Sequence, residues 1–206
     1  LRPECGEDSF RVSGTAPCGD TNHIAASGRR RYDARLIGQQ LGVDVLSARP
    51  REGIERPALA VRSTRLSLPL RSVSSEQAAM AKANAPKVGG SELPFLVQVE
   101  TATTLDLLRR GATLDAEVQV LRLSPDVAIV LLPGEVFADL GLAIKRGSPF
   151  RHTLVIELAN DNPAYIPTEK AFKEGSYETV NSRIAPGGGE RLVETAIQLL
   201  KESVVR

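Results

Sequence analysis

One short apolar run constrains the fold of this 206-residue chain more than any other feature. Residues 127–132 are all apolar, and Pro125 and Pro133 bound them. A run this short is typical of a strand buried on both faces, because a core helix needs about ten residues or more. Residues 135–146 follow directly and carry apolar side chains at helical spacing. We therefore expect a buried central strand that leads into a helix, with Glu135 in the first helical turn.

Strands and helices are expected to alternate through the rest of the second half. The apolar patterns predict strands at 95–99, 116–123 and 153–159, and helices at 168–174 and 190–203. Alternation of this kind indicates an α/β fold in which helices flank a mixed β-sheet. We expect the whole chain, residues 1–206, to be one part of a larger α/β domain.

The first half carries weaker patterns. Apolar residues at spacings of three to five predict an amphipathic helix over 32–46. Residues 59–70 alternate between apolar and polar side chains, which predicts a strand that Pro69 either ends or places at a sheet edge. Large apolar residues are scarce between 72 and 92, so we expect a mobile insertion there, with a short helix near 75–82.

The composition excludes two classes of function. Lys and Arg number 26 against 25 Asp and Glu, a balance that argues against a nucleic-acid-binding protein. No apolar run approaches the ~18 residues that a transmembrane helix needs. The two cysteines, Cys5 and Cys18, fit either one small disulfide loop or two independent thiols.

Three segments carry side chains suited to chemistry. Glu135 and Tyr165 each follow an expected buried strand, and ligands gather at the carboxyl ends of strands in α/β sheets. Helix-terminal charge for Glu135 and turn packing for Tyr165 are the alternatives. Asp20, Asn22 and His23 fit a catalytic or ligand-binding loop, or a turn held by side-chain hydrogen bonds. With two histidines in all, the chain alone cannot build a histidine-rich zinc centre.

Taken together, these segments resemble the carboxyl half of the neutral/alkaline non-lysosomal ceramidase family, especially its bacterial members. The resemblance rests on residues 117–123, 127–141, 159–169 and 175–178, followed by the terminal helix. Upstream, Gly19-Asp20-Thr21-Asn22 lies where the family has its Gly-Asp-x-Ser nucleophile segment.

The resemblance implies a zinc-dependent hydrolase that cleaves an amide bond, of N-acylsphingosine or another lipid or small amide, with metal-activated water. It implies that Glu135 and Tyr165 are zinc ligands, that Tyr177 steadies the oxyanion, and that Asp20 and Asn22 belong to the catalytic loop, with His23 beside the substrate. It also implies that the histidine ligands come from an amino-terminal segment outside these 206 residues, and that the protein is soluble and secreted or periplasmic.

Asn22 motivates a second interpretation. An amide side chain cannot repeat the acid and base steps of the family's serine hydroxyl. The alternative is therefore a non-catalytic member of the family that acts as a binding or scaffolding domain.

Overall fold

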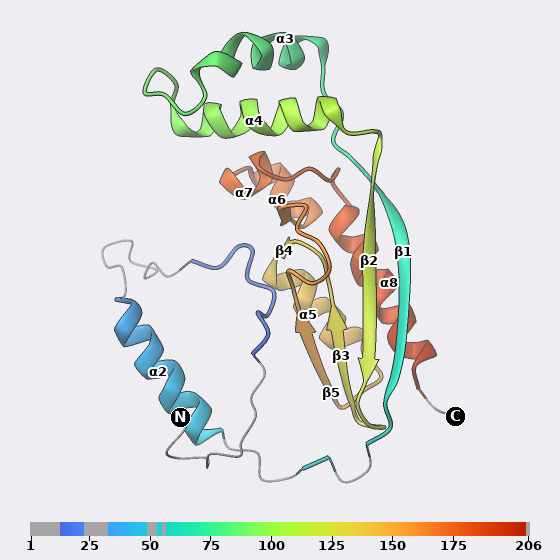
Figure 1. Cartoon of the computed structure of the whole chain (residues 1–206). Helices are drawn as coiled ribbons and strands as arrows, with labels where there is room; N and C mark the ends of the chain where they lie inside the picture. Colours follow the sequence, from blue (N-terminus) through green and yellow to red (C-terminus); the bar gives the residue numbers. More distant parts are fainter. Residues whose placement is uncertain (1–12, 23–32, 49–52, 55–56, 205–206) are drawn as a thin grey trace.

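The computed structural model describes residues 13–22, 33–48, 53–54 and 57–204. A four-stranded sheet with the strand order β1-β2-β3-β5 forms its centre (Figure 1). Its strands are β1 (Ala60–Pro69), β2 (Thr113–Arg122), β3 (Val127–Leu131) and β5 (His152–Ile156). β1, β2 and β3 pair antiparallel, whereas β3 and β5 pair parallel. This mixed sheet with flanking helices confirms the expected α/β fold class.

Two helices cover one face of the sheet. They are α5 (Ala138–Gly147) and α8 (Gly188–Glu202), and in Figure 1 both lie behind the strands. α8 packs on β1 and β2, and α5 packs on β5 and α8. The side chains that fill this layer are aliphatic and almost fully buried: Leu68, Val118, Val120, Ala128, Val130, Leu140, Ile144, Val155, Leu192, Ala196 and Leu200. Burial of this apolar face is the main stabilising contribution.

Several expected elements are present with shifted ends. They are α2 (Ala34–Ser47), β1, β2, α6 (Glu169–Glu174) and α8. Pro69 is the last residue of β1, and β1 is an edge strand, as its proline requires. α2 has no buried residue, so its apolar side chains are unpartnered within the described part of the chain.

The strand expected at 95–99 is wrong. These residues begin the helix α4 (Phe95–Arg109), which starts directly after Pro94. The alternation of apolar residues misled because Phe95 and Leu96 are largely exposed. The inward face of α4 instead carries Thr101, Thr103, Thr104 and Leu107, and three of these four are polar.

Two expectations about residues 127–146 also need correction. Glu135 does not lie in a helical turn, because residues 135 and 136 form the short strand β4 (Glu135–Val136) and α5 begins only at Ala138. Gly134, with φ of 72°, makes the turn that separates β3 from β4. The residues of β3 are fully buried on one face only, since Ile129 on the other face is partly exposed. β5 is an edge strand of the sheet rather than a fully buried one.

Residues 72–92 contain the expected short helix. α3 (Ser75–Asn84) begins at a capping box made by Ser74 and Gln77, and the 3-10 turn η1 (Ala85–Lys87) follows it. α3 packs against α4, and the two form a helical hairpin at one end of the sheet (Figure 1). Among the described residues, no helix combines the length and the apolar character needed to cross a membrane.

Candidate functional site

The centre of the candidate site is a second, very small sheet. β4 pairs parallel with β6 (Tyr165–Ile166), so that Glu135 lies opposite Tyr165 and Val136 opposite Ile166. Val136 and Ile166 are fully buried, whereas Glu135 and Tyr165 are partly exposed. Neighbouring strands are about 4.8 Å apart and successive side chains point to opposite faces. Glu135 and Tyr165 are therefore brought side by side on the partly exposed face of this pair, where Tyr165 also packs against the edge of the core.

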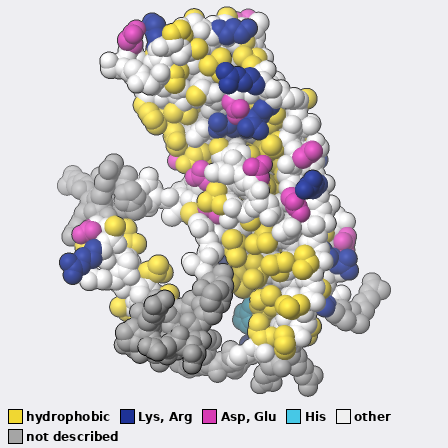
Figure 2. Space-filling view, viewed as in Figure 1, with side chains coloured by type: hydrophobic (Ala, Val, Ile, Leu, Met, Phe, Trp, Pro, Cys, Tyr) yellow, Lys and Arg dark blue, Asp and Glu magenta, His cyan; other side chains and the backbone are white. Residues whose placement is uncertain are grey.

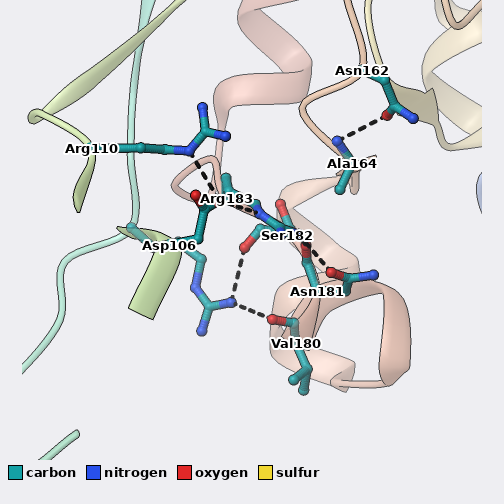
Figure 3. Close-up of polar contacts among 9 residues, drawn as sticks. Asp106, Arg110, Asn162, Ala164, Val180, Asn181, Ser182 and Arg183 are labelled. Carbon is teal, nitrogen blue, oxygen red and sulfur yellow. Dashed lines mark hydrogen bonds and ion pairs between the residues drawn. The ribbon is translucent and has the colours of Figure 1, made fainter. Parts of the chain in front are cut away.

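Turn residues just before each strand fix this pairing. The Glu135 N–H donates to the Ala164 carbonyl at 3.0 Å. Ala164 has φ of 69°, and its own N–H donates to the Asn162 side chain at 3.0 Å (Figure 3). A Cβ on Gly134 would lie 2.6 Å from the Ala164 carbonyl oxygen, so only glycine fits there. The polar turn before Tyr165 thus has a positioning role.

The phenol of Tyr165 is held in its protonated form. Burial first, then hydrogen bonding to the Glu135 carboxylate and that carboxylate's charge, together raise the pKa of Tyr165 to about 12. The charges of Tyr177 and Glu178 contribute in the same direction. In the absence of a cation, loss of the Tyr165 proton is thus disfavoured, and a bound cation would favour that loss.

Tyr177 lies next to this pair. It begins α7 (Tyr177–Val180), and its ring meets the Tyr165 ring edge-on with 5.7 Å between centroids. The Tyr177 ring also stacks on the Phe95 ring of α4, again with 5.7 Å between centroids. The Tyr177 hydroxyl accepts a hydrogen bond from the Asn181 amide at 3.2 Å. The structure therefore brings Glu135, Tyr165 and Tyr177 together, although they are up to 42 positions apart (177 − 135) in sequence.

A polar network holds the segment after Tyr177. Arg183 donates to Asp106 of α4 at 3.1 Å, and Arg110 donates to the same oxygen at 3.0 Å (Figure 3). Arg183 also donates to the Asn181 side chain at 2.6 Å. Burial by itself would raise the pKa of Asp106, but the hydrogen bonds and charges of Arg183 and Arg110 outweigh it and lower that pKa. Asn181, which orients Tyr177, is thus tied to the α3–α4 hairpin.

Residues 18–22, which we call the Gly-Asp loop, reach the same place from the first part of the chain. The Gly19 N–H donates to the Val136 carbonyl of β4 at 2.9 Å. A Cβ on Gly19 would lie 2.4 Å from the Glu135 carbonyl oxygen, so this close approach requires glycine. Asp20 accepts a hydrogen bond from the Ala138 N–H at 2.8 Å, which satisfies a free donor at the start of α5. Asp20 therefore lies near the candidate site, and its side chain also caps the start of α5.

Glu157 is the residue that sequence reasoning missed. Its side chain is 3% exposed and accepts from the Val136 N–H at 2.6 Å, the Cys18 N–H at 3.3 Å and the Cys18 thiol at 3.1 Å. This carboxylate joins β4 to the Gly-Asp loop through Val136 and Cys18. The signal in the sequence was a single acidic residue inside the apolar segment 153–159, where an isolated charge is costly unless it is well hydrogen-bonded.

The remaining two candidates are Asn22 and His23, and no contact between either of them and Glu135 or Tyr165 is found among the described residues. Asn22 is exposed and has no regular structure, and His23 lies outside the described residues. An open cavity of about 370 Å³ lies between α5, α6 and the start of α7. Asp20, Phe137, Ser176 and Glu178 line part of it, whereas Glu135, Tyr165 and Tyr177 do not.

A metal at this site would find two oxygen donors from the described residues. Glu135 and Tyr165 supply a carboxylate and a phenol, which zinc accepts, but zinc sites have three or four protein ligands. No group of three or more His, Cys, Asp or Glu side chains suited to a metal occurs in the described ranges. His152 cannot be a further ligand of this site. It begins β5 beside Val127, at the opposite end of the strands from Glu135. Glu135 and Tyr165 would therefore supply two of the three or four protein ligands that a zinc site needs.

No model of a known protein family matches the chain, and no curated protein matches it in sequence. Its structure is similar to the crystal structure of neutral ceramidase from Pseudomonas aeruginosa, with 17% identity and a TM-score of 0.51. It is also similar to a ceramidase complexed with C2, with 13% identity and a TM-score of 0.53. The matches cover 90% and 85% of this chain but 36% of each ceramidase chain. The expected resemblance is thus confirmed at the level of the fold: the chain has the fold of about one third of neutral ceramidase.

Proposed function

We propose that this chain supplies one half of the active site of a ceramidase-like, zinc-dependent amide hydrolase. The observation that carries the proposal is the pairing of Glu135 with Tyr165 across β4 and β6, with Tyr177 against Tyr165. The ceramidase-like fold supports it, because the resemblance of the sequence to that family implies metal-binding and oxyanion roles for the same three residues.

Glu135 and Tyr165 are the proposed zinc ligands of this half. Zinc held there would polarise the amide carbonyl and acidify water. The raised pKa of Tyr165, about 12, reflects burial first and then the adjacent carboxylate, so its proton leaves readily only when a cation is near. The nitrogen ligands that complete the centre are proposed to come from polypeptide outside these 206 residues.

Tyr177 is the proposed donor to the oxyanion that develops when the amide is attacked. Its hydroxyl oxygen accepts from Asn181, so its own proton stays free to point at a substrate oxygen. Stacking on Phe95 and the edge contact with Tyr165 fix the ring without consuming that proton. A fixed donor of this kind stabilises charge that appears in the transition state.

The Gly-Asp loop is proposed to border the scissile amide. Gly19 and Asp20 attach the loop to β4 and α5, beside Glu135. Asn22 follows on the exposed side of the loop and His23 continues it. The Asn22 amide can hold a substrate carbonyl or a water, but it transfers no proton. The proposed substrates are N-acylsphingosine or another lipid amide, and the proposed location is outside the cytoplasm, by analogy with the family.

Metal content and turnover of the natural-length protein test this proposal. We expect bound zinc and hydrolysis of an N-acyl amide in the parent, with zinc lost in Glu135→Gln and Tyr165→Phe. Tyr177→Phe should keep its zinc but lose about 100-fold or more in kcat, as for one oxyanion donor. His152→Ala is the matched control, since His152 lies at the other end of the strands. A zinc-free parent under metal-replete conditions would refute the proposal.

A non-catalytic binding or scaffolding role is the second candidate. Asn22, at the position of the family's serine, favours it. The two candidates differ in a single assay: intact protein that binds zinc but turns over no member of a panel of N-acyl amides supports the scaffold. Turnover that is abolished by Tyr165→Phe excludes it.

A further inference from the structure

Tyr177 has a hydrogen-bond partner whose orientation follows from its own neighbours. The amide nitrogen of Asn181, Nδ2, lies 3.2 Å from the Tyr177 hydroxyl oxygen. The amide oxygen of Asn181, Oδ1, lies 2.6 Å from a guanidinium nitrogen of Arg183. A guanidinium only donates hydrogen bonds, so the Asn181 atom that faces Arg183 must be the oxygen. The nitrogen of the same amide must therefore face Tyr177.

This arrangement decides where the Tyr177 proton can point. An amide nitrogen carries two N–H donors and does not accept hydrogen bonds. The Tyr177 hydroxyl can therefore accept from Asn181 but cannot donate to it. Its own proton is left for a different acceptor, and this is the polarity that a donor to an oxyanion needs.

Arg183 is itself held on two sides (Figure 3). Its side chain is 19% exposed and donates to the Asp106 carboxylate of α4 at 3.1 Å. A second nitrogen of the guanidinium donates to the backbone and side-chain oxygens of Asn181, at 2.5 and 2.6 Å. On the molecular surface, Lys and Arg side chains lie next to acidic ones near the end of α4 (Figure 2). The Asn181 amide therefore cannot turn over without the loss of a charge-assisted hydrogen bond.

The carboxyl-terminal end of α7 is anchored separately. α7 has four residues, and so short a helix has little stability of its own. Backbone carbonyls at the end of a helix lack helical partners. One nitrogen of Arg71, which lies two residues after β1, donates at 3.0–3.1 Å to three such oxygens, those of Thr179, Val180 and Ser182. The backbone that carries Tyr177 and Asn181 is thus attached to the end of the sheet.

We infer that Asn181 is a positioning residue for the proposed reaction, and that it directs the Tyr177 proton toward the substrate oxygen while Arg183 keeps the Asn181 amide in the required orientation. The inference rests on the proposed role of Tyr177. A carboxylate at position 181 could not fill this role, because it accepts hydrogen bonds and would take the Tyr177 proton for itself. The choice between an amide and a carboxylate therefore separates this role from simple support of the fold.

Turnover of an N-acyl amide and zinc content of the natural-length protein test the inference. Asn181→Asp keeps an acceptor for Arg183 but reverses the hydrogen bond with Tyr177, so kcat should fall by about 100-fold or more. Asn181→Ala only removes the donor, and kcat should fall by about tenfold. Both variants should keep their zinc. Asn84→Asp is the matched control and should leave kcat unchanged, because Asn84 ends α3 and its side chain makes no capping hydrogen bond.

A second measurement reports on the hydrogen bond itself and needs no turnover. The NMR resonance of the Tyr177 Cζ carbon, identified by its loss in Tyr177→Phe, moves downfield when the phenol donates to a carboxylate. It should move downfield in Asn181→Asp and not in Asn181→Ala. Circular dichroism checks folding, and the resonance in Asn181→Asp decides if Asn181→Ala fails to fold.

The outcomes separate this inference from the proposed function. A kcat in Asn181→Asp that equals or exceeds that of Asn181→Ala would overturn the inference, as would an unmoved Tyr177 resonance in Asn181→Asp. Full turnover in Tyr177→Phe would refute the proposed role of Tyr177, and the inference with it. A strong loss in Tyr177→Phe beside unaffected Asn181 variants would refute the inference alone.

Discussion

Two regions hold the candidate site, and they are built in different ways. The first, which we call the sheet layer, consists of β2, β3, β5, α5 and α8 and supports β4 and β6. Its interior is aliphatic, with Val118, Val130, Ile144, Leu192 and Leu200 at most 1% exposed. The second is the α3–α4 hairpin, whose buried side chains are Ala81, Thr101, Thr103, Thr104 and Leu107. The hairpin meets the site through Phe95 and Asp106.

This difference assigns a separate task to each region. The sheet layer fixes the backbone that carries Glu135 and Tyr165, and apolar burial supplies most of its stability. The hairpin holds Tyr177 and Asn181 through one ring contact and one polar network, which contribute far less. Substitutions in the sheet layer should therefore unfold the protein, whereas substitutions in the hairpin should alter the site and leave the fold intact.

The largest effect is expected from Leu200→Ala in α8. Leu200 is fully buried against the sheet, so its truncation removes apolar contacts and leaves a cavity. The free energy of unfolding, measured by urea denaturation, should fall by about 3–5 kcal/mol. Leu142→Ala, at a 47% exposed position on α5, is the control and should change it by less than about 0.5 kcal/mol. Similar losses in the two variants would contradict the division of tasks.

A smaller effect is expected from Asp106→Asn in the hairpin. The change removes the charge that Arg183 and Arg110 share, and its cost should be about 1 kcal/mol, because a side chain that is 32% exposed is screened by water. The folded-state pKa of Asp106 lies below its ordinary value of 3.8, so the contribution is present above pH 3.8 and is lost as pH falls through the lowered pKa. Acid unfolding curves should differ above that range and converge below it.

The sequence predicted the sheet layer well because its pattern and its packing agree. The apolar run at 127–132 located β3, and the helical stripe at 190–203 is apolar where α8 is buried, so the periodicity of that stripe reports the core directly. In the α3–α4 hairpin, the apolar pattern and the packing disagree. α4 exposes Phe95 and Leu96 and buries threonines, and the apolar alternation at 95–99 was therefore misread as a strand.

The candidate site shows the same division. The turn signals after the expected strands located Glu135 and Tyr165 correctly. They did not predict that Glu135 lies in a strand, because β4 forms only through backbone pairing with β6. Tyr177 came from the family resemblance. Glu157 and Phe95 were missed because their roles depend on contacts 139 (157 − 18) and 82 (177 − 95) positions away in sequence. No local pattern encodes such contacts.

Phe95→Leu should have a still smaller effect on stability and a visible effect on Tyr177. Phe95 is 67% exposed, so the loss of its stacking should cost about 0.5 kcal/mol. The chain has no Trp and three Tyr, so near-UV circular dichroism reports tyrosine packing directly. The tyrosine signal should decrease in Phe95→Leu and stay unchanged in Leu96→Ala, its exposed neighbour. An unchanged signal in both would mean that the hairpin does not order Tyr177.

The last prediction concerns the thiol of Cys18, which is partly buried in the loop beside β4. Burial first, then the hydrogen bond to Glu157 and the charges of Glu157, Glu135 and Asp20, together raise the pKa of Cys18 from 9.0 to about 11. Between those values the folded state keeps a proton that the unfolded state has lost, so stability should fall as pH rises from about 9 to about 11. In Cys18→Ser this decline should be absent.

Glu157→Gln tests whether the carboxylate contributes to that shift. Removal of its charge should bring the Cys18 pKa, followed by the pH dependence of thiolate absorbance, to a value between 9.0 and about 11, since burial remains. Because glutamine still accepts a hydrogen bond from the Val136 N–H, β4 should keep its place. A Cys18 pKa that does not move would mean that burial alone protects the thiol, and that Glu157 joins the Gly-Asp loop to β4 through the two backbone N–H groups without acting on the thiol.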